Sequence, residues 1–123
     1  IGPIRKAVTR LRELRPGAAV IGFPRGASHR AGLFARETGV NCVGMDIGAD
    51  LAAARAAVGP DICLQGNLDP MCLVAGGAAL DRATDRILAA AGSGPHVFNL
   101  GHGVVPATPI EHVSHLVGRV TGR

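Results

Sequence analysis

One histidine between two glycines is the residue of this sequence best placed for chemistry. His102 stands in the run 101–103, Gly-His-Gly, directly after the apolar stretch 96–100. The flanking glycines allow close approach of a ligand to the backbone and leave the imidazole free to face a cleft. An imidazole there can donate a hydrogen bond to a carboxylate or carry a proton near neutral pH. The plainer interpretation is a histidine in a glycine-rich turn, because one Gly-His-Gly run is a weak motif.

A second run, residues 65–70, places two polar side chains between a glycine and a proline. Asn67 and Asp69 stand between Gly66 and Pro70, so the loop is tightly shaped and could present an amide and a carboxylate at a pocket rim. The alternative is structural, with Asp69 capping the helix that follows and Asn67 shaping the turn.

Two further charged residues end the first two expected strands. Arg25 follows Phe23 and Pro24, and it could bind a carboxylate of a substrate or remain a surface charge. Asp46 ends the stretch 41–46 and could line the same rim. It could also serve only as a hydrogen-bond partner that orients neighbouring loop amides.

Short apolar stretches alternate with helical patterns along the whole chain. Strands are expected at 18–23, 41–46, 62–65 and 96–100, and helices at 4–14, 29–38, 51–58, 78–91 and 109–120. Gly39 and Asp50 are the expected helix caps. This alternation predicts βα units and a parallel sheet, with the loops 24–28, 46–50, 66–70 and 101–106 along one edge. Four strands form either a small open sheet or half of a larger barrel.

The composition favours a small anionic ligand. Hydrophobic residues make up 47% of the 123 residues while tryptophan and tyrosine are absent, which predicts a core of Ala, Val, Leu and Ile. The net charge is +4, and all but one of the 13 basic residues are arginine, whose fork suits carboxylates. A nucleic-acid surface would add aromatic stacking platforms, so no nucleic-acid partner is expected. The five cations of the opening helix are expected on a solvated face.

Other classes of protein are not favoured. The cysteines at 42, 63 and 72 lack a Cys-x-x-Cys pair, so buried reduced thiols are expected instead of zinc or disulfides. His112 and His115 lie three apart with no third ligand in place, so no metal site is expected. No leader and no apolar run near ~20 residues is present, which predicts a cytoplasmic protein away from membranes. The start at Ile1 suggests a chain cut from something longer.

Three runs together resemble one enzyme family. Residues 64–70 (LQGNLDP), 98–103 (FNLGHG) and 108–113 (TPIEHV) are similar to motifs of uroporphyrinogen decarboxylases, and 39–46 resembles the strand of that family that ends in Gly-Leu-Asp. The resemblance covers essentially the whole chain, as the C-terminal third of the family. One departure is Ile47, where the family typically has tryptophan, which leaves the local packing in doubt.

The resemblance implies the C-terminal half of a (β/α)₈ TIM barrel, with residues 1–123 forming a fragment of a single barrel domain. It implies that the enzyme is a carboxy-lyase, that it forms a homodimer, and that it uses no cofactor. The enzyme removes carbon dioxide from the acetate arms of uroporphyrinogen III to give coproporphyrinogen III in heme biosynthesis. The aspartate treated as essential in the family lies upstream, so no catalytic residue is assigned within this segment. Of the family's substrate contacts only the histidine maps here, at His102, and substrate binding is favoured over proton transfer.

The main alternative belongs to the same superfamily. Zinc- and corrinoid-dependent methyltransferases resemble this chain in fold, but they carry a cysteine where His102 stands and a His-x-Cys pair where residues 23–26 stand. Without thiolate ligands their zinc site cannot assemble. A third hypothesis is a fragment that is inactive by itself and binds anions weakly.

Overall fold

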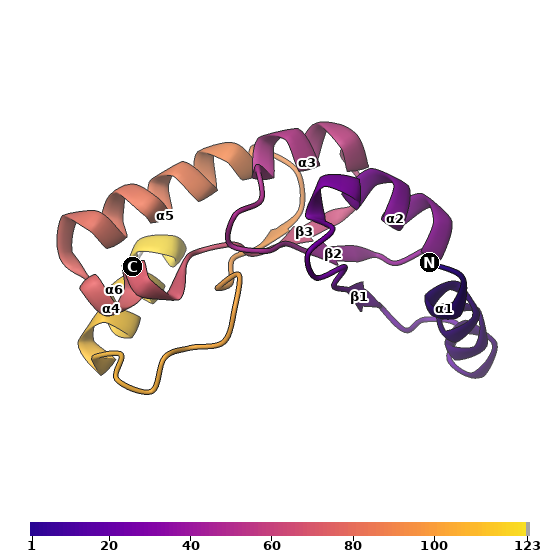
Figure 1. Ribbon diagram of the computed structural model, residues 1–123, viewed down its shortest axis with the longest axis horizontal. Coiled ribbons are helices and arrows are strands. Elements are labelled where there is room, and N and C mark those ends of the chain that lie inside the picture. The colour runs from indigo at the N-terminus through magenta and orange to yellow at the C-terminus, as the bar shows by residue number, and fades with distance from the viewer. Residues whose placement is uncertain (123) are drawn as a thin grey trace.

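Four parallel strands form one sheet, and neighbours in the sheet are neighbours in the sequence. The computed structural model describes residues 1–122 and gives the strand order β1-β2-β3-β4. The strands are β1 (Ile21–Gly22), β2 (Cys42–Gly44), β3 (Cys63–Gln65) and β4 (His96–Val97). The predicted α/β class, with parallel strands that alternate with helices, is confirmed (Figure 1).

The helices lie where the pattern predicts them, with one addition. They are α1 (Gly2–Leu14), the short 3₁₀ helix η1 (Ser28–Arg30), α2 (Ala31–Thr38), α3 (Leu51–Val58), α4 (Pro70–Ala75), α5 (Gly77–Ala91) and α6 (Ile110–Thr121). Both predicted caps are confirmed. Gly39 ends α2 in the left-handed conformation with φ 72°, and the Asp50 carboxylate accepts a hydrogen bond of 2.9 Å from the Ala53 amide. The addition is α4, which the sequence analysis left as loop.

The strands are shorter than predicted. The expected strand 96–100 pairs regularly only at His96 and Val97, and it meets the segment after β3 again through a single bridge between Leu68 and Leu100. The physical reason is the turn at Gly66, whose φ of 130° takes the chain out of the ladder between Gln65 and Leu68.

Helices cover one face of the sheet and leave the other bare. Figure 1 shows α2, α3 and α5 along one side of the strands. On that side Val43 and Leu64 are completely buried. On the opposite side Ile21, Phe23 and Val97 remain 55%, 48% and 47% exposed. An apolar sheet face of this kind is normally packed against further structure.

The core is built mainly from small aliphatic residues, as predicted, with two differences. Phe34 and Met45 are also buried, at 4% and 2% exposure. Ile62 and Ile87 are only partly buried at its edge, whereas isoleucine was expected within the core. A second cluster lies between α4, α5 and α6 and consists of Leu68, Leu73, Leu80, Ala83 and Leu116.

Four of the five cations at positions 5, 6, 10, 12 and 15 are exposed, as predicted, and Arg12 is half-buried. Arg12 donates a hydrogen bond of 2.5 Å to the carbonyl oxygen of Gly39, at the end of α2. Arg5 forms an ion pair with Glu37. These two arginines hold α1 against α2.

The cysteines are free thiols, as expected. Cys42 is buried, and Cys63 and Cys72 are half-buried. Burial, with a smaller contribution from the neighbouring Cys63, raises the pKa of Cys42 to about 12. Cys42 is therefore protonated at neutral pH. Within residues 1–122, no helix combines the length and the apolar character that crossing a membrane requires.

Candidate functional site

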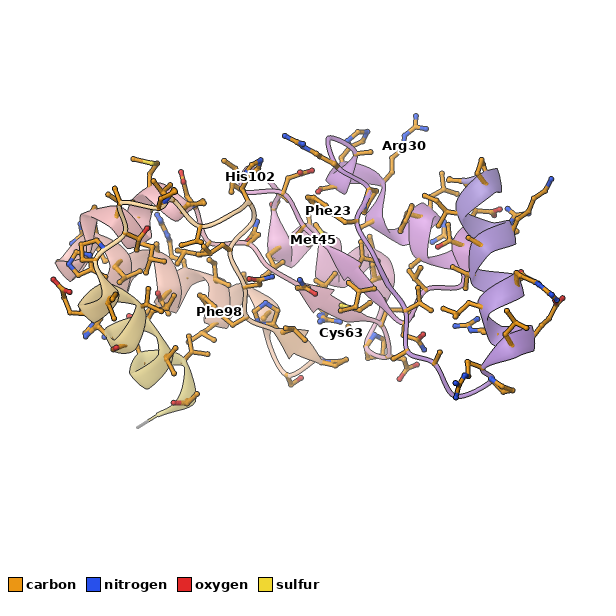
Figure 2. All side chains as sticks on the ribbon, turned by 90° about the horizontal axis from the view of Figure 1, so that it is seen from below. Phe23, Arg30, Met45, Cys63, Phe98 and His102 are labelled. Carbon is orange, nitrogen blue, oxygen red and sulfur yellow. The ribbon has the colours of Figure 1, made fainter. Side chains whose placement is uncertain are left out.

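A cavity of about 290 Å³ lies on the bare face of the sheet, at the carboxyl ends of the strands. Residues from the ends of all four strands line it, including Arg25 and His102. In Figure 2, His102 lies beyond the strands, and Phe23 and Met45, which also line the cavity, lie on the same side. The carboxyl edge of a parallel sheet is where α/β proteins usually bind their ligands. The sequence analysis expected the polar residues at this edge.

Arg25 and His102 meet across the cavity. The Arg25 Nη2 atom lies 3.3 Å from His102 Nε2, although the two residues are 77 positions apart in the sequence. Arg25 follows β1 and His102 follows β4, so this contact joins the loops of the two outer strands. Gly44, which also lines the cavity, leaves space for the Phe23 side chain, because a Cβ atom there would lie 3.0 Å from the Phe23 ring.

The glycines beside His102 differ in what surrounds them. A Cβ atom at Gly101 would lie 2.6 Å from the backbone nitrogen of Ile47, so Gly101 lets the loop after β4 approach the loop after β2. A Cβ atom at Gly103 would meet no other atom within 4 Å. The close approach predicted from the glycines is therefore an approach between two loops at Gly101. Ile47, the departure from the family pattern, is 48% exposed beside this contact.

Asp46 orders the loop that carries Arg25. Its Oδ2 atom accepts hydrogen bonds of 2.8 Å from the Gly26 amide and 2.8 Å from the Ser28 hydroxyl. The Asp46 amide in turn donates to the Ser28 oxygen at 3.1 Å. Asp46 thus orients loop groups, the alternative that the sequence analysis left open, and it does not line the cavity of His102. Ser28, the first residue of η1, was missed, because its partner Asp46 is 18 positions away and no local pattern indicates that contact.

Asn67 and Asp69 have structural partners. Asn67 is 6% exposed, and its Nδ2 atom donates to the Asp46 and Ala49 carbonyl oxygens, both at 2.9 Å. Asp69 caps α4 by accepting a hydrogen bond of 2.9 Å from the Met71 amide. Both line a separate hollow between the loop after β2, α4 and α5. Of the five rim residues expected together, only Arg25 and His102 line the cavity on the bare face.

The other histidines do not converge on a site. His96 lies 2.7 Å from the Gly66 carbonyl oxygen through Nε2, and burial lowers the pKa of its imidazole. His112 contacts the Leu73 carbonyl oxygen at 2.9 Å, and His115 pairs with Asp81 on the surface at 2.7 Å. Residues 1–122 contain no cluster of three or more side chains able to hold a metal ion.

Comparison with known proteins agrees with these motifs. The family model "Uroporphyrinogen decarboxylase (URO-D)" matches residues 1–122. The chain belongs to this family. Among curated proteins named uroporphyrinogen decarboxylase, that of Sphingopyxis alaskensis is 55% identical over 99% of this chain. The proteins of the same name from Gluconacetobacter diazotrophicus and Rhodospirillum rubrum are 50% and 48% identical, each over 98% of the chain.

The chain covers only part of these relatives. It spans 36% of the length of the Sphingopyxis alaskensis protein and 34% of the other two. The family fold is a TIM barrel, and four parallel βα units are half of its eight strands. The match to decarboxylases over the whole described chain does not favour the methyltransferase alternative.

Proposed function

We propose that this chain is the C-terminal part of a longer uroporphyrinogen decarboxylase, in which it supplies four barrel strands and one wall of the substrate pocket. Three observations support the proposal: the family match, the 34–36% coverage of the relatives, and the bare apolar face with Ile21, Phe23 and Val97. Strands from the rest of the barrel would pair with the free edges of β1 and β4 and cover that face. The segment alone is proposed to be inactive.

The proposed reaction removes the carboxylate of each acetate arm of uroporphyrinogen III to form coproporphyrinogen III. Protonation of a pyrrole carbon makes the ring an electron sink beside the acetate. The bond between the methylene carbon and the carboxylate breaks, carbon dioxide leaves, and the electron pair moves into the ring. A proton returned to the methylene carbon completes a methyl group, and loss of the proton first added to the pyrrole carbon restores the aromatic ring. A carboxylate from outside this segment stabilises the cationic ring, and no cofactor takes part.

His102 is the proposed substrate-binding residue of this segment. The observation that carries the proposal is the cavity at the carboxyl edge, which is lined by His102 together with residues from the ends of all four strands. The neighbouring Arg25 cation makes this wall suitable for a polyacidic macrocycle. The site therefore offers the imidazole of His102 as a hydrogen-bond donor to the carboxylates of the substrate, with the Arg25 cation beside it.

The test is His102→Gln in the full-length protein, assayed for coproporphyrinogen formation. Loss of one hydrogen bond to a charged group lowers kcat/KM roughly tenfold or more. His115→Gln is the matched control, because His115 pairs with Asp81 on the α6 surface away from the cavity. Unchanged kinetics in His102→Gln, with the fold intact, would remove His102 from the site.

We also propose that the full-length enzyme is a homodimer that acts in the cytoplasm on the pathway to heme. The absence of a membrane-spanning helix within residues 1–122 is compatible with that location. Light scattering of the full-length protein measures the oligomeric state.

A further inference from the structure

The contact between Arg25 and His102 determines which nitrogen of the imidazole carries the hydrogen. Arg25 Nη2 and His102 Nε2 lie 3.3 Å apart. A guanidinium carries only hydrogen-bond donors and stays protonated in proteins. Nε2 must therefore accept the hydrogen bond through its lone pair. In a neutral imidazole this arrangement leaves the hydrogen on Nδ1.

Arg25 is held in place by its own loop. The Arg25 amide donates to the Phe23 carbonyl oxygen at 3.0 Å, and the Ala27 amide donates to that of Pro24 at 2.8 Å. The Asp46 carboxylate fixes the next residue through the Gly26 amide at 2.8 Å. Among residues 1–122 the Arg25 guanidinium forms no ion pair, so no acidic side chain of this segment neutralises its charge.

We infer that Arg25 is a positioning residue that keeps His102 in the Nδ1–H form, so that this N–H meets a carboxylate of the substrate. The inference rests on the proposed function and adds a specificity determinant to it. A hydrogen bond accepted at Nε2 from a cation polarises the ring and strengthens the Nδ1–H donor. His102 then serves as an anchor for a carboxylate and not as the acid that delivers a proton, because a neutral imidazole with Nε2 occupied has no proton to spare.

The first test observes the ring without substrate. Nitrogen-15 spectra of the histidine-labelled full-length protein distinguish Nδ1–H from Nε2–H imidazole, and His102→Gln identifies the resonances. The expected result is the Nδ1–H form in the unsubstituted protein and a mixture of tautomers in Arg25→Ala. Arg30→Ala is the control, since Arg30 is an exposed arginine of η1 whose side chain extends away from His102 in Figure 2. A predominant Nε2–H form, or no change in Arg25→Ala, overturns the inference.

The second test separates binding from turnover. Arg25→Ala is expected to raise KM roughly tenfold with little change in kcat, because an anchor contributes to binding in the ground state and the transition state alike. Arg25→Lys keeps a cationic donor and should restore part of the loss. In a His102→Gln background, Arg25→Ala should add little, since its effect passes through the missing imidazole. Full additivity would instead mean that Arg25 binds substrate independently, and would overturn the positioning role.

The two tests keep the inference apart from the proposed function. The tautomer is read in the free protein and does not depend on which reaction is catalysed. A protein with the Nδ1–H form but no decarboxylase activity would contradict the proposed function alone. An active decarboxylase in which Arg25→Ala leaves the His102 tautomer unchanged would contradict the inference alone.

Discussion

An arginine lies at each end of the parallel strands, and the two arginines bind different groups. At the amino edge, Arg55 donates to the Gly59, Ile62 and Pro95 carbonyl oxygens at 3.0, 2.7 and 2.6 Å. At the carboxyl edge, the side chain of Arg25 contacts only the His102 ring among residues 1–122, at 3.3 Å. An arginine whose donors are occupied by backbone carbonyls stabilises the fold. One whose side chain reaches a histidine at the site can instead orient that histidine.

This difference agrees with a general rule for barrels of parallel strands. Residues at the amino edge contribute to stability, and residues at the carboxyl edge form the active site. Arg55 joins the end of α3 to the chain segments that enter β3 and β4. Gly94 makes room for it, because a Cβ atom there would lie 2.6 Å from the guanidinium carbon. Substitutions at the amino edge should therefore change the free energy of unfolding, and substitutions at the carboxyl edge should change KM.

The largest effect on stability is expected from Arg55→Met. It removes the donors to three carbonyl groups and lowers the free energy of unfolding by about 3 kcal/mol. Urea denaturation of the full-length protein measures this change. KM should stay unchanged in the protein that remains folded. Arg82→Met, at an exposed position of α5, is the control and should stay within about 0.5 kcal/mol. A rise in KM without loss of stability would place Arg55 with the functional edge.

A smaller effect, shared between stability and binding, is expected from Asp46→Ala. The Gly26 amide and the Ser28 hydroxyl lose their acceptor, which lowers the free energy of unfolding by roughly 1–2 kcal/mol. The loop of Arg25 also loosens, so KM should rise. Asp46→Asn keeps one acceptor oxygen and should restore part of both losses. If stability falls and KM does not change, the carboxyl edge is structural at this position, like the amino edge.

The smallest expected effect is on the pH dependence of stability, and it comes from His96 on β4. Burial lowers the pKa of folded His96 below the value of 6.5 for a free imidazole. The neutral form is therefore favoured by folding. The stabilisation is fully present above pH 6.5 and is lost as the pH falls through the lower pKa of the folded protein. Urea midpoints across this range should decrease less in His96→Gln than in the unsubstituted protein. His29→Gln, an exposed histidine, should leave the slope unchanged.

Features that depend on neighbouring residues were predictable from the sequence. Gly39 and Asp50 cap helices where the local pattern places them, because a cap needs only residues within one turn. The helix α4 could have been predicted in the same way, since Asp69 followed by Pro70 is a common start of a helix. The alternation of strands and helices likewise predicted the parallel sheet and the edge that holds His102.

Contacts between distant loops were not predictable in the same way. The carboxyl edge was expected to gather Arg25, Asp46, Asn67, Asp69 and His102 at one rim. In the structure Asn67 turns to the Asp46 and Ala49 carbonyl oxygens, because its buried amide needs partners. The contact of Arg25 with His102 joins residues 77 positions apart, on the loops that follow the two outer strands. Local sequence patterns do not encode where loops so distant in the chain meet.

In the longer protein that we propose, the strands of this segment are synthesised last. The earlier strands then leave the ribosome without partners for their outer edges, and the barrel cannot close until β4 has emerged. Ile21, Phe23 and Val97, exposed on the bare face, become the inner wall only at that moment. Closure after translation would leave this apolar surface open during synthesis, when exposed apolar surface and unpaired strand edges favour aggregation.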